Sequence, residues 1–571
     1  MTLWESFAGH AGRAPGKVAI VSHRTADARG DGGCPPDSGG GSRQGQSDIV
    51  TYGRLAALAE RFAGALVELG VAPGEVVSFQ LPNWWEVAAL HLACVRTGAV
   101  ANPIITILRR REVGFILDRV ASRVCIVPGE FRGFDHAAML ADLRGELPAL
   151  EHVFVCRSES VPDGLEPFEP YFCATPWEDK HPAAELDRRR PAPSDPAQLM
   201  FTSGTTGEPK GAVHSHETMD IGLRAVSEPL GLGGDDVVLM FSPLGHQTGY
   251  LYGMCMPLKY GMKLVLQDAW DPVTMLRLVE AERVTWTMGT TTFVLDACAA
   301  AARHPEADLS SLRFFTCGGA PIPPKAVTEA RARLGTQLVA VWGMTEVGVC
   351  TTTRPPGGRV SPRQGRREPP RNDSDETVCS SDGAPVDWVE LRIVDGDGRD
   401  VAAGGEGRLL VRTPSQHLTY HGRPDLYAAA FPEGVEAGWF DTGDLARFGP
   451  GGSIRITGRA KDLIIRGGEN IPVAEVEAGL ITHPLVHEVA VVAYPDDRLG
   501  EKVCAVVVPS GGEAPTLDGL RAHLESLGMA KPFWPERLVV KEALPKTASG
   551  KTQKFALREE LAAPSPGTVA Q

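Results

Sequence analysis

A short loop near residue 200 constrains the fold more than any other feature of this 571-residue chain. Residues 201–211 read FTSGTTGEPKG and are crowded with hydroxyls and glycines. Glycines let the backbone turn tightly with its N–H groups converging on an anion, hydroxyls add donors, and Lys210 adds a mobile positive charge. The largely apolar run 198–201 predicts the end of a β-strand. We therefore expect a phosphate-binding loop after a strand rather than an ordinary turn.

Two common nucleotide-binding motifs are missing from the sequence. The P-loop of NTPases requires G-x-x-x-x-G-K-[ST], and the nearest match, at 550–552, has Pro545 where the first glycine should stand. No G-x-G-x-x-G opens a helix after a strand, so a dinucleotide fold has no support. Another scaffold must hold the phosphate.

Length and composition narrow the class of protein. A chain of 571 residues exceeds a single core, so we expect two or more domains. The formal net charge of -14 argues against a nucleic-acid binder. Eleven cysteines without a C-x-x-C pair suit a reducing compartment, and the N-terminus has no basic segment before an apolar run. We therefore expect a cytoplasmic protein without a signal peptide.

Helical and strand patterns alternate along the chain, which predicts an α/β fold. Thr51 is placed to cap a helix with an apolar face, and 76–81 follows as a strand. Two polar segments rich in Gly, Ser, Pro or Arg interrupt this pattern, at about 24–47 and 354–381. We expect both to be disordered insertions without a chemical role.

The stretch 237–258 contains no Asp, Glu, Lys or Arg. A charge-free segment of this length can span a bilayer, but this one is broken by Pro243, Gly245, Gly249 and Pro257. It predicts a buried strand, loop and helix that line a pocket, and no integral membrane segment.

Four further segments complete a recognisable set: VWGMTE at 341–346, DTGD at 441–444, TGRAKD at 457–462 followed by RGGEN at 466–470, and PKTASGK at 545–551. Each alone is weak. In this order and spacing, from about residue 4 to 559, they resemble the adenylate-forming superfamily of acyl-CoA synthetases, luciferases and peptide-synthetase adenylation domains.

The resemblance implies the fold and the domains. We expect a large N-terminal domain of layered sheets and helices over 1–460, and a small mobile α+β C-terminal domain over 461–571. Lys461 stands at the hinge, where many relatives carry Asp. The small domain is expected to alternate between two poses, one for each half-reaction.

The resemblance also implies ATP, Mg²⁺ and coenzyme A as cofactors or co-substrates. Lys551, Thr345, Glu346 and Lys210 would be catalytic. Glu346 would hold Mg²⁺, a hard cation that prefers oxygen ligands. Trp342 would stack on adenine, and Asp444 would accept from the ribose hydroxyls. The full nucleotide-binding set would be Thr202, Ser203, Gly204, Thr205, Thr206, Gly207, Lys210, Gly319, Ala320, Trp342, Gly343, Met344, Thr345, Asp444, Arg459 and Lys551.

The remaining site residues would bind the other two substrates. Gly467, Gly468 and Glu469 would border the pantetheine channel, where a side chain would block a narrow tunnel. His246, Thr248, Tyr250, Gly318 and Gly348 would line the acyl pocket, together with Met288, Thr290 and Phe293.

The acyl group is expected to be a non-amino carboxylic acid. Amino-acid-activating relatives place an Asp near the position of His246, and 243–250 contains no acid. A buried ammonium without a partner would be costly. The segments 245–249 and 317–320 look most like those of medium-chain and alicyclic acyl-CoA ligases such as cyclohexanecarboxylate ligases, and aryl acids stay open.

Three functions compete at this point. The first is an acyl-CoA ligase, and the second is an acyl-AMP ligase that loads a separate carrier protein. The third is a non-enzymatic protein on the same fold, which ranks last because Lys551, Glu346 and Lys210 are all present. A second copy of the chain also stays open as a partner.

Overall fold

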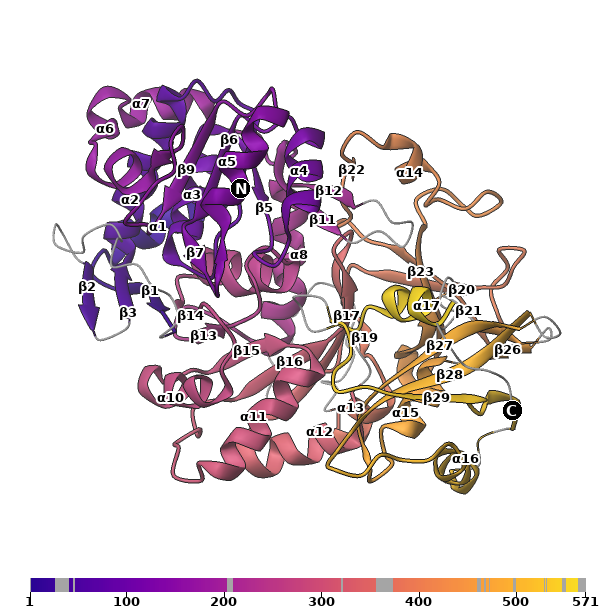
Figure 1. Ribbon diagram of the computed structural model, residues 1–571. Coiled ribbons are helices and arrows are strands. Elements are labelled where there is room, and N and C mark those ends of the chain that lie inside the picture. Colours follow the sequence, from indigo (N-terminus) through magenta and orange to yellow (C-terminus); the bar gives the residue numbers. More distant parts are fainter. Residues whose placement is uncertain are drawn as a thin grey trace.

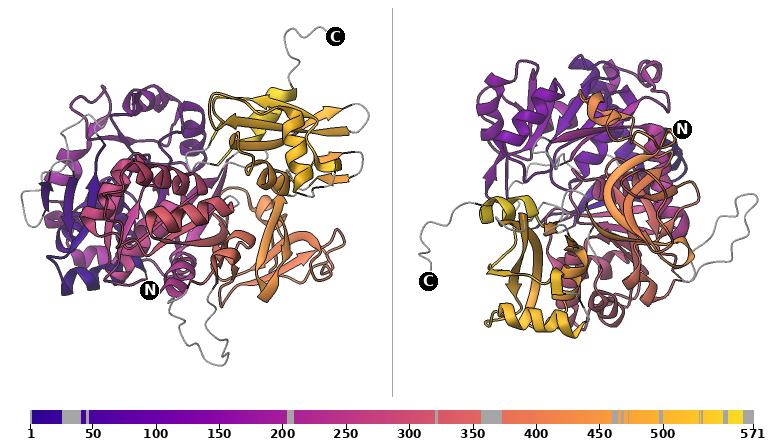
Figure 2. Two further views of the ribbon diagram at one scale, coloured as in Figure 1. Left: turned by 90° about the horizontal axis from the view of Figure 1, so that it is seen from below. Right: turned by 90° about the vertical axis from the view of Figure 1, so that its right-hand side faces the viewer.

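The computed structural model describes residues 2–25, 41–44, 47–202, 209–319, 322–355, 373–459, 464–466, 469–471, 473–496, 500–527, 529, 531–546 and 551–562. It is a mixed α/β structure built on two large sheets with helices between and around them (Figure 1). Two smaller sheets stand at one end of the molecule (Figure 2).

The first sheet is parallel through its centre and becomes antiparallel at both edges. Its strands follow the order β19 (Ala384–Pro385), β18 (Gly348–Thr352), β17 (Gln337–Met344), β16 (Phe314–Gly318), β15 (Trp286–Gly289), β13 (Val237–Met240), β14 (Lys263–Gln267), β1 (Val18–His23), β3 (Ser47–Thr51) and β2 (Gly41–Gln44).

The second sheet is parallel from β10 to β11 and ends in two antiparallel pairings. Its order is β10 (Glu166–Pro167), β9 (His152–Cys156), β6 (Val124–Pro128), β4 (Val76–Phe79), β5 (Val100–Pro103), β11 (Pro196–Thr202), β12 (Lys210–Ser215) and β22 (Thr419–Tyr420).

Alternating burial along the strands produces a layered core. In β1, Ile20 belongs to the apolar cluster between the two sheets, and Val21 belongs to the cluster on the outer face of the first sheet. The helices between the sheets include α2 (Tyr52–Glu68), α3 (Trp85–Thr97), α8 (His216–Leu230), the π-helix η4 (Thr248–Cys255) and α9 (Met256–Tyr260). The outer faces are covered by α10 (Pro272–Glu282), α11 (Thr291–Arg303) and α12 (Pro324–Glu329) on one side, and by α4 (Arg110–Arg119) and α5 (His136–Leu143) on the other.

Several local expectations are confirmed. The Thr51 hydroxyl accepts a hydrogen bond from the backbone N–H of Arg54 at 3.2 Å and caps α2. The run 198–201 lies in β11, and 237–258 forms β13, a loop, η4 and most of α9. No helix in the described part of the chain is long and apolar enough to cross a membrane.

The expected disorder of the two insertions is wrong where they contain paired or capped segments. Strand β2 pairs with β3 from Gly41 to Gln44, because the edge of the first sheet offers free backbone groups there. Helix α13 (Asp375–Ser380) is capped by Ser374 and buries Val378 against the outer-face cluster. The middle of each insertion falls outside the described residues.

The C-terminal third of the chain forms the two smaller sheets. The third sheet is antiparallel, in the order β20 (Glu390–Val394), β21 (Glu406–Arg412), β23 (Phe440–Phe448) and β24 (Ile454–Arg459). The fourth sheet contains β26 (Glu469–Ile471), β25 (Ile464–Arg466), β28 (Gly500–Pro509) and β27 (Val486–Asp496), with β29 (Arg537–Val540) on β28. Its helices are α15 (Val473–Leu480), α16 (Leu517–Ser526) and α17 (Lys554–Ala562).

Candidate active site

The candidate site lies where β16 and β17 of the first sheet end beside the third sheet and the C-terminal segment. Loops at the carboxyl ends of parallel strands are the usual place for ligands in such folds. In Figure 1, the yellow C-terminal strands and α17 stand next to β17 and the orange strands of the third sheet. An ion pair of 2.9 Å between Arg447 and Glu475 joins β23 to α15.

Asp444 lies at the centre of a fixed polar cluster. Its Oδ2 accepts a hydrogen bond from Nε1 of Trp342 at 2.9 Å, and its Oδ1 forms an ion pair of 2.9 Å with Nε of Arg459. The carboxylate is buried, so these partners hold it more strongly than they would in water. Strands β17, β23 and β24 thereby bring together three residues predicted to bind the nucleotide.

Glu346 follows β17 and is buried with its own set of partners. Its Oε1 accepts from the Tyr420 hydroxyl at 2.9 Å, and its backbone carbonyl accepts from the N–H of His417 at 2.7 Å. Burial raises the pKa of Glu346, and the charges of Arg459 and Lys210 act in the opposite direction. The Nζ of Lys210 lies 5.2 Å from the centre of the Tyr420 ring.

The predicted metal role of Glu346 fits the chemistry of magnesium. Within the described residues, no cluster of three or more His, Cys, Asp or Glu side chains forms a dedicated metal cage. Mg²⁺ usually keeps several waters and binds one or two carboxylates together with substrate phosphates. A single buried carboxylate in the field of Lys210 is compatible with that pattern.

The backbone of Thr345 is held by a histidine that the sequence analysis did not include among the site residues. His214, in β12, donates from Nε2 to the Thr345 carbonyl at 2.7 Å and contacts the Thr218 hydroxyl through Nδ1 at 3.2 Å. Burial lowers its pKa to about 4, so the ring is neutral at pH 7. His214 therefore fixes the backbone of the turn that carries Thr345.

Lys551 reaches the same site from the C-terminal segment. A Cβ placed on Gly319 would stand 2.8 Å from Cε and 3.3 Å from Nζ of Lys551, so the lysine lies directly over this glycine. Burial lowers the pKa of Lys551 and Arg459 acts in the same direction, while Asp444 and Glu346 raise it. The lysine thus lies in the field of the residues that surround the predicted phosphate site.

The acyl-pocket predictions divide into two groups. His246 is half-buried, and burial followed by the charge of Lys551 lowers its pKa to about 4. Thr248 is half-buried, and its N–H donates to Nδ1 of His246 at 3.3 Å. The Oγ1 of Thr290 is buried and has no hydrogen-bond partner among the described residues. The assignment of these three residues to a pocket wall stays a prediction.

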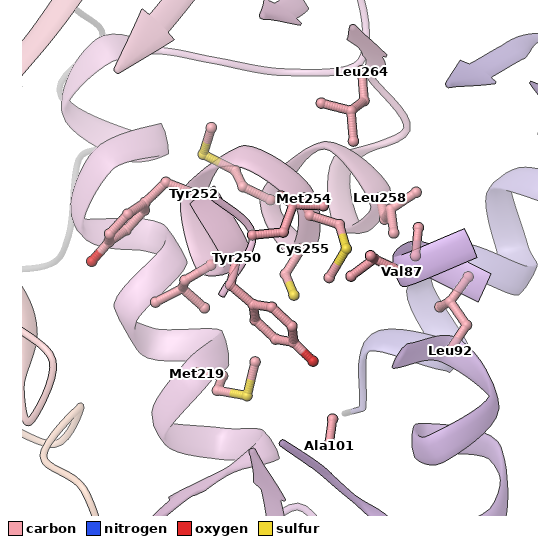
Figure 3. Close-up of a cluster of buried hydrophobic side chains, with 14 of the residues drawn as sticks. Val87, Leu92, Ala101, Met219, Tyr250, Tyr252, Met254, Cys255, Leu258 and Leu264 are labelled. Atoms are coloured by element: carbon pink, nitrogen blue, oxygen red, sulfur yellow. The ribbon is translucent and has the colours of Figure 1, made fainter. Parts of the chain in front are cut away.

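Tyr250 differs from its predicted place on that wall. It has no exposed surface, its hydroxyl bonds to Nδ1 of His91 at 2.6 Å, and its ring lies among core side chains with Cys255 and Met219 (Figure 3). Tyr250 lies in η4, a π-helix with i→i+5 bonding, and its side chain belongs to the apolar cluster between the two sheets.

Tyr252 stands beside Gly348 instead. Its hydroxyl accepts from the Val349 N–H at 2.7 Å, and a Cβ on Gly348 would stand 3.1 Å from that oxygen. Gly348 has a φ of +69°, and a Cβ on Gly318 would stand 2.6 Å from the Val341 carbonyl. Both glycines are therefore required by the local packing, whatever else they contact.

Some predicted site residues cannot be placed. Those outside the described residues are Ser203, Gly204, Thr205, Thr206, Gly207, Ala320, Lys461, Gly467 and Gly468. The backbone of Glu469 begins β26 and pairs with Arg466.

Two family models match most of the chain. The family model described as AMP-binding enzyme matches residues 7–421, and the model described as AMP-binding enzyme C-terminal domain matches 475–551. A medium-chain fatty-acid–CoA ligase of Escherichia coli (strain K12) is 35% identical over 90% of this chain and 86% of its own length.

Two further similarities concern aryl acids. A 2-hydroxy-7-methoxy-5-methyl-1-naphthoate–CoA ligase of Streptomyces carzinostaticus is 33% identical, over 89% of this chain and 88% of its own. The crystal structure of the anthranilate CoA ligase AuaEII in complex with anthranoyl-AMP superimposes with a TM-score of 0.80 at 25% identity, over 98% of this chain and 97% of that one.

Proposed function

The chain belongs to the AMP-binding enzyme family, and we propose that it is an ATP-dependent acyl-CoA ligase for a non-amino carboxylic acid. In the first step a carboxylate oxygen attacks the α-phosphorus of ATP, the bond to the β-phosphate breaks, and pyrophosphate leaves. In the second step the sulfur of CoA attacks the acyl carbon, the bond to AMP breaks, and the thiol proton goes to solvent.

The observation that carries this proposal is the position of Lys551. It stands over Gly319, and its pKa is influenced by Arg459, Asp444 and Glu346. A cation held there offsets the negative charge that develops when a carboxylate meets the α-phosphate. Because Lys551 comes from the C-terminal segment, its presence supports a structure arranged for adenylation.

The other site residues take roles that follow from their contacts. We assign Glu346 to the metal, which would supply Lewis-acid stabilisation of the phosphate charge. We assign Asp444 and Trp342 to the nucleoside, because their mutual hydrogen bond holds both side chains in place. His246 and Thr290 are assigned to the acid, since the first is a neutral ring beside Lys551 and the second holds an unused hydroxyl.

We also propose that the boundary between a large domain and a mobile small domain lies at Lys461. The third sheet ends with β24 at Arg459, and the fourth sheet begins with β25 at Ile464. No strand pairing in the described part of the chain joins these two sheets. A hinge between separately hydrogen-bonded sheets can turn without breaking a strand ladder.

The acid is proposed to be medium-chain, alicyclic or aryl, and the enzyme to act in the cytoplasm. The segment 237–258 supplies no carboxylate to pair with an ammonium, and the similar ligases are named for medium-chain and aryl acids. Every cysteine among the described residues is free, and all of them except Cys379 are buried, which supports a reducing compartment.

The test is a panel of hexanoate, cyclohexanecarboxylate, benzoate and free α-amino acids, assayed for pyrophosphate release with and without CoA. We expect acid-dependent pyrophosphate release with one of the three neutral acids, followed by AMP release that requires CoA. Pyrophosphate release without CoA-dependent AMP release would favour the alternative, an acyl-AMP ligase that loads a separate carrier protein. Faster activation of an α-amino acid would contradict the proposed substrate class.

A further inference from the structure

Three consecutive backbone carbonyls of the turn that follows β17 each accept a hydrogen bond from a side chain of another segment. Carbonyls in a turn have no partner in a strand ladder, so a buried turn needs donors from elsewhere. All three donor side chains are themselves buried. The pairs are His214 Nε2 with the carbonyl of Thr345 at 2.7 Å, His417 Nδ1 with that of Glu346 at 3.1 Å, and the Ser415 hydroxyl with that of Val347 at 2.7 Å. We call the three donors the carbonyl cradle.

The acceptors determine which ring nitrogen of each histidine carries a hydrogen. A carbonyl oxygen can only accept, so a neutral His214 is protonated at Nε2 and a neutral His417 at Nδ1. Nε2 of His417 is buried and has no hydrogen-bond partner within the described part of the chain. The rings of Tyr420, Tyr427 and Phe440 pack around His417, with centroid distances from 4.6 to 5.6 Å. The two histidines are therefore opposite tautomers in fixed orientations.

The segment that carries His417 holds Glu346 at both ends. The backbone N–H of His417 is a second donor to the Glu346 carbonyl, at 2.7 Å, and the Tyr420 hydroxyl donates to the Glu346 carboxylate at 2.9 Å. A peptide that accepts two hydrogen bonds from one residue has little freedom to rotate, and the direction of its side chain follows the peptide. The ring of His417 therefore acts on the same carboxylate that Tyr420 contacts directly.

We propose that His417 is a positioning residue for the carboxylate of Glu346 and acts with His214 through the carbonyls of the turn, an inference that rests on the proposed metal role of Glu346. The cradle keeps the carboxylate in one direction before Mg²⁺ and phosphate arrive, which removes the cost of ordering it during binding. Hydrogen-bond partners behind a metal ligand commonly contribute about 10- to 100-fold to metal affinity. A histidine that only fills space would not affect the metal.

The test uses two amide side chains that replace the two ring nitrogens separately. The amide N–H of Asn reaches the place of histidine Nδ1, and that of Gln reaches the place of Nε2. Binding of ATP to the full-length protein is measured by calorimetry with and without Mg²⁺, and without a carboxylic acid. We expect His417→Gln to weaken binding of ATP with Mg²⁺ by about tenfold and His417→Asn by less than about twofold, with metal-free binding unchanged in both. At His214 the order should be reversed, with Gln tolerated and Asn not.

His10 provides the matched control. It lies in α1 (Leu3–Arg13), outside the candidate site, and its Nε2 is 3.1 Å from the Lys259 carbonyl. His10→Asn removes the same kind of hydrogen bond as His214→Asn and should leave both ATP affinities unchanged. Equal effects of Asn and Gln at His417, or equal losses with and without Mg²⁺, would overturn the proposal, because either result indicates a role in packing alone.

Nitrogen NMR of the protein with isotope-labelled histidine measures the two tautomers without any ligand. We expect His417 to be protonated at Nδ1 and His214 at Nε2, with each signal assigned by its loss in the corresponding variant. Protonation of His417 at Nε2 would overturn the proposal. If the protein binds ATP but no acid gives pyrophosphate release, the proposed ligase function fails, while the tautomers and the comparison of Asn with Gln still decide the role of His417.

Discussion

Gly319 offers a way to displace Lys551 without altering the lysine itself. Gly319 has a φ of +82°, and a Cβ there would stand 2.8 Å from Cε of Lys551, closer than any normal carbon contact. We expect Gly319→Ala to push the ammonium group away from the α-phosphate position, because the lysine chain is the flexible partner. The first half-reaction should then fall while the second survives.

The size of the effect follows from two contributions. Alanine in the left-handed region costs about 1–2 kcal/mol of backbone strain, which affects stability in both half-reactions alike. Displacing a catalytic group by about 1 Å can cost about 10²-fold in rate, and losing a preorganised cation costs about 10²–10³-fold. We therefore expect adenylation to fall by about 10²-fold in Gly319→Ala and by at least as much in Lys551→Ala.

Gly335 provides the matched control. It also has a positive φ, of +64°, and a Cβ there would meet no atom within 4 Å. Gly335→Ala carries the same backbone strain without touching the site, so it should lower thermal stability and leave adenylation almost unchanged. Each variant is assayed for acid-dependent pyrophosphate release and, separately, for thioester formation from supplied acyl-AMP.

The double variant Gly319→Ala/Lys551→Ala decides the mechanism. If the glycine acts through the lysine, the double variant should adenylate no more slowly than Lys551→Ala alone. Additive losses, or equal damage to both half-reactions in Gly319→Ala, would refute this reasoning and indicate that Gly319 contacts the nucleotide directly.

Three further predictions concern single side chains. Glu346→Gln should lower adenylation by about 10²–10³-fold at limiting Mg²⁺, because the amide cannot replace the charge at the metal, and a near-normal rate would argue against the metal role. Trp342→Phe keeps a flat ring but removes the donor to Asp444, so the KM of ATP should rise by about fivefold, about 1 kcal/mol, with the KM of the acid unchanged. Arg157→Met leaves Glu86 buried without its 2.7 Å partner and should lower the free energy of unfolding by about 3–5 kcal/mol in guanidinium titrations; a loss below 1 kcal/mol would contradict this.

Features set by neighbouring residues were predictable from the sequence. The Thr51 cap depends on a residue three positions away, and the break of 237–258 into strand, loop and helix depends on its own prolines and glycines. The layered α/β class follows from the alternation of such local patterns. These features need no knowledge of how distant segments meet.

The polar supports of the site were not predictable in the same way. His214 bonds to a carbonyl 131 positions away, and Tyr420 bonds to Glu346 across 74 positions. The Tyr420 contact depends on β22, a two-residue strand that pairs with β12 and that no sequence pattern predicts. The sequence shows only that His214 follows the 201–211 loop by three residues. The expectation for Tyr250 came from the resemblance, and in the structure its side chain has no exposed surface and bonds to His91.

Buried histidines should make the protein sensitive to mild acid. Burial lowers the pKa of His214 to about 4, and of His91 and His417 to about 3. The unfolded chain takes up protons on these rings near pH 6.5 and the folded protein does not, so their contribution to stability is complete above pH 6.5 and is lost as the pH falls toward 4. At pH 5 each histidine lowers the free energy of unfolding by about 2 kcal/mol.

Buried carboxyl groups work in the opposite direction, and Glu169 is an example. Burial raises the pKa of Glu169 to about 6, so the folded state binds its proton first and gains stability as the pH falls from 6 toward 4.5. At pH 5 the proton on Glu169 offsets about 1.4 kcal/mol, less than the contribution of one histidine, so acid should still lower the unfolding free energy. Guanidinium titrations at pH 7, 6 and 5 measure how the free energy of unfolding depends on pH. His214→Gln keeps a donor for the Thr345 carbonyl and should reduce this dependence by the contribution of one histidine. Only a histidine ring that is kept from water in the folded state makes the unfolding free energy depend on pH in this way. If that free energy does not change with pH, or changes equally in His214→Gln, the rings become solvated before the protein unfolds and the reasoning is wrong.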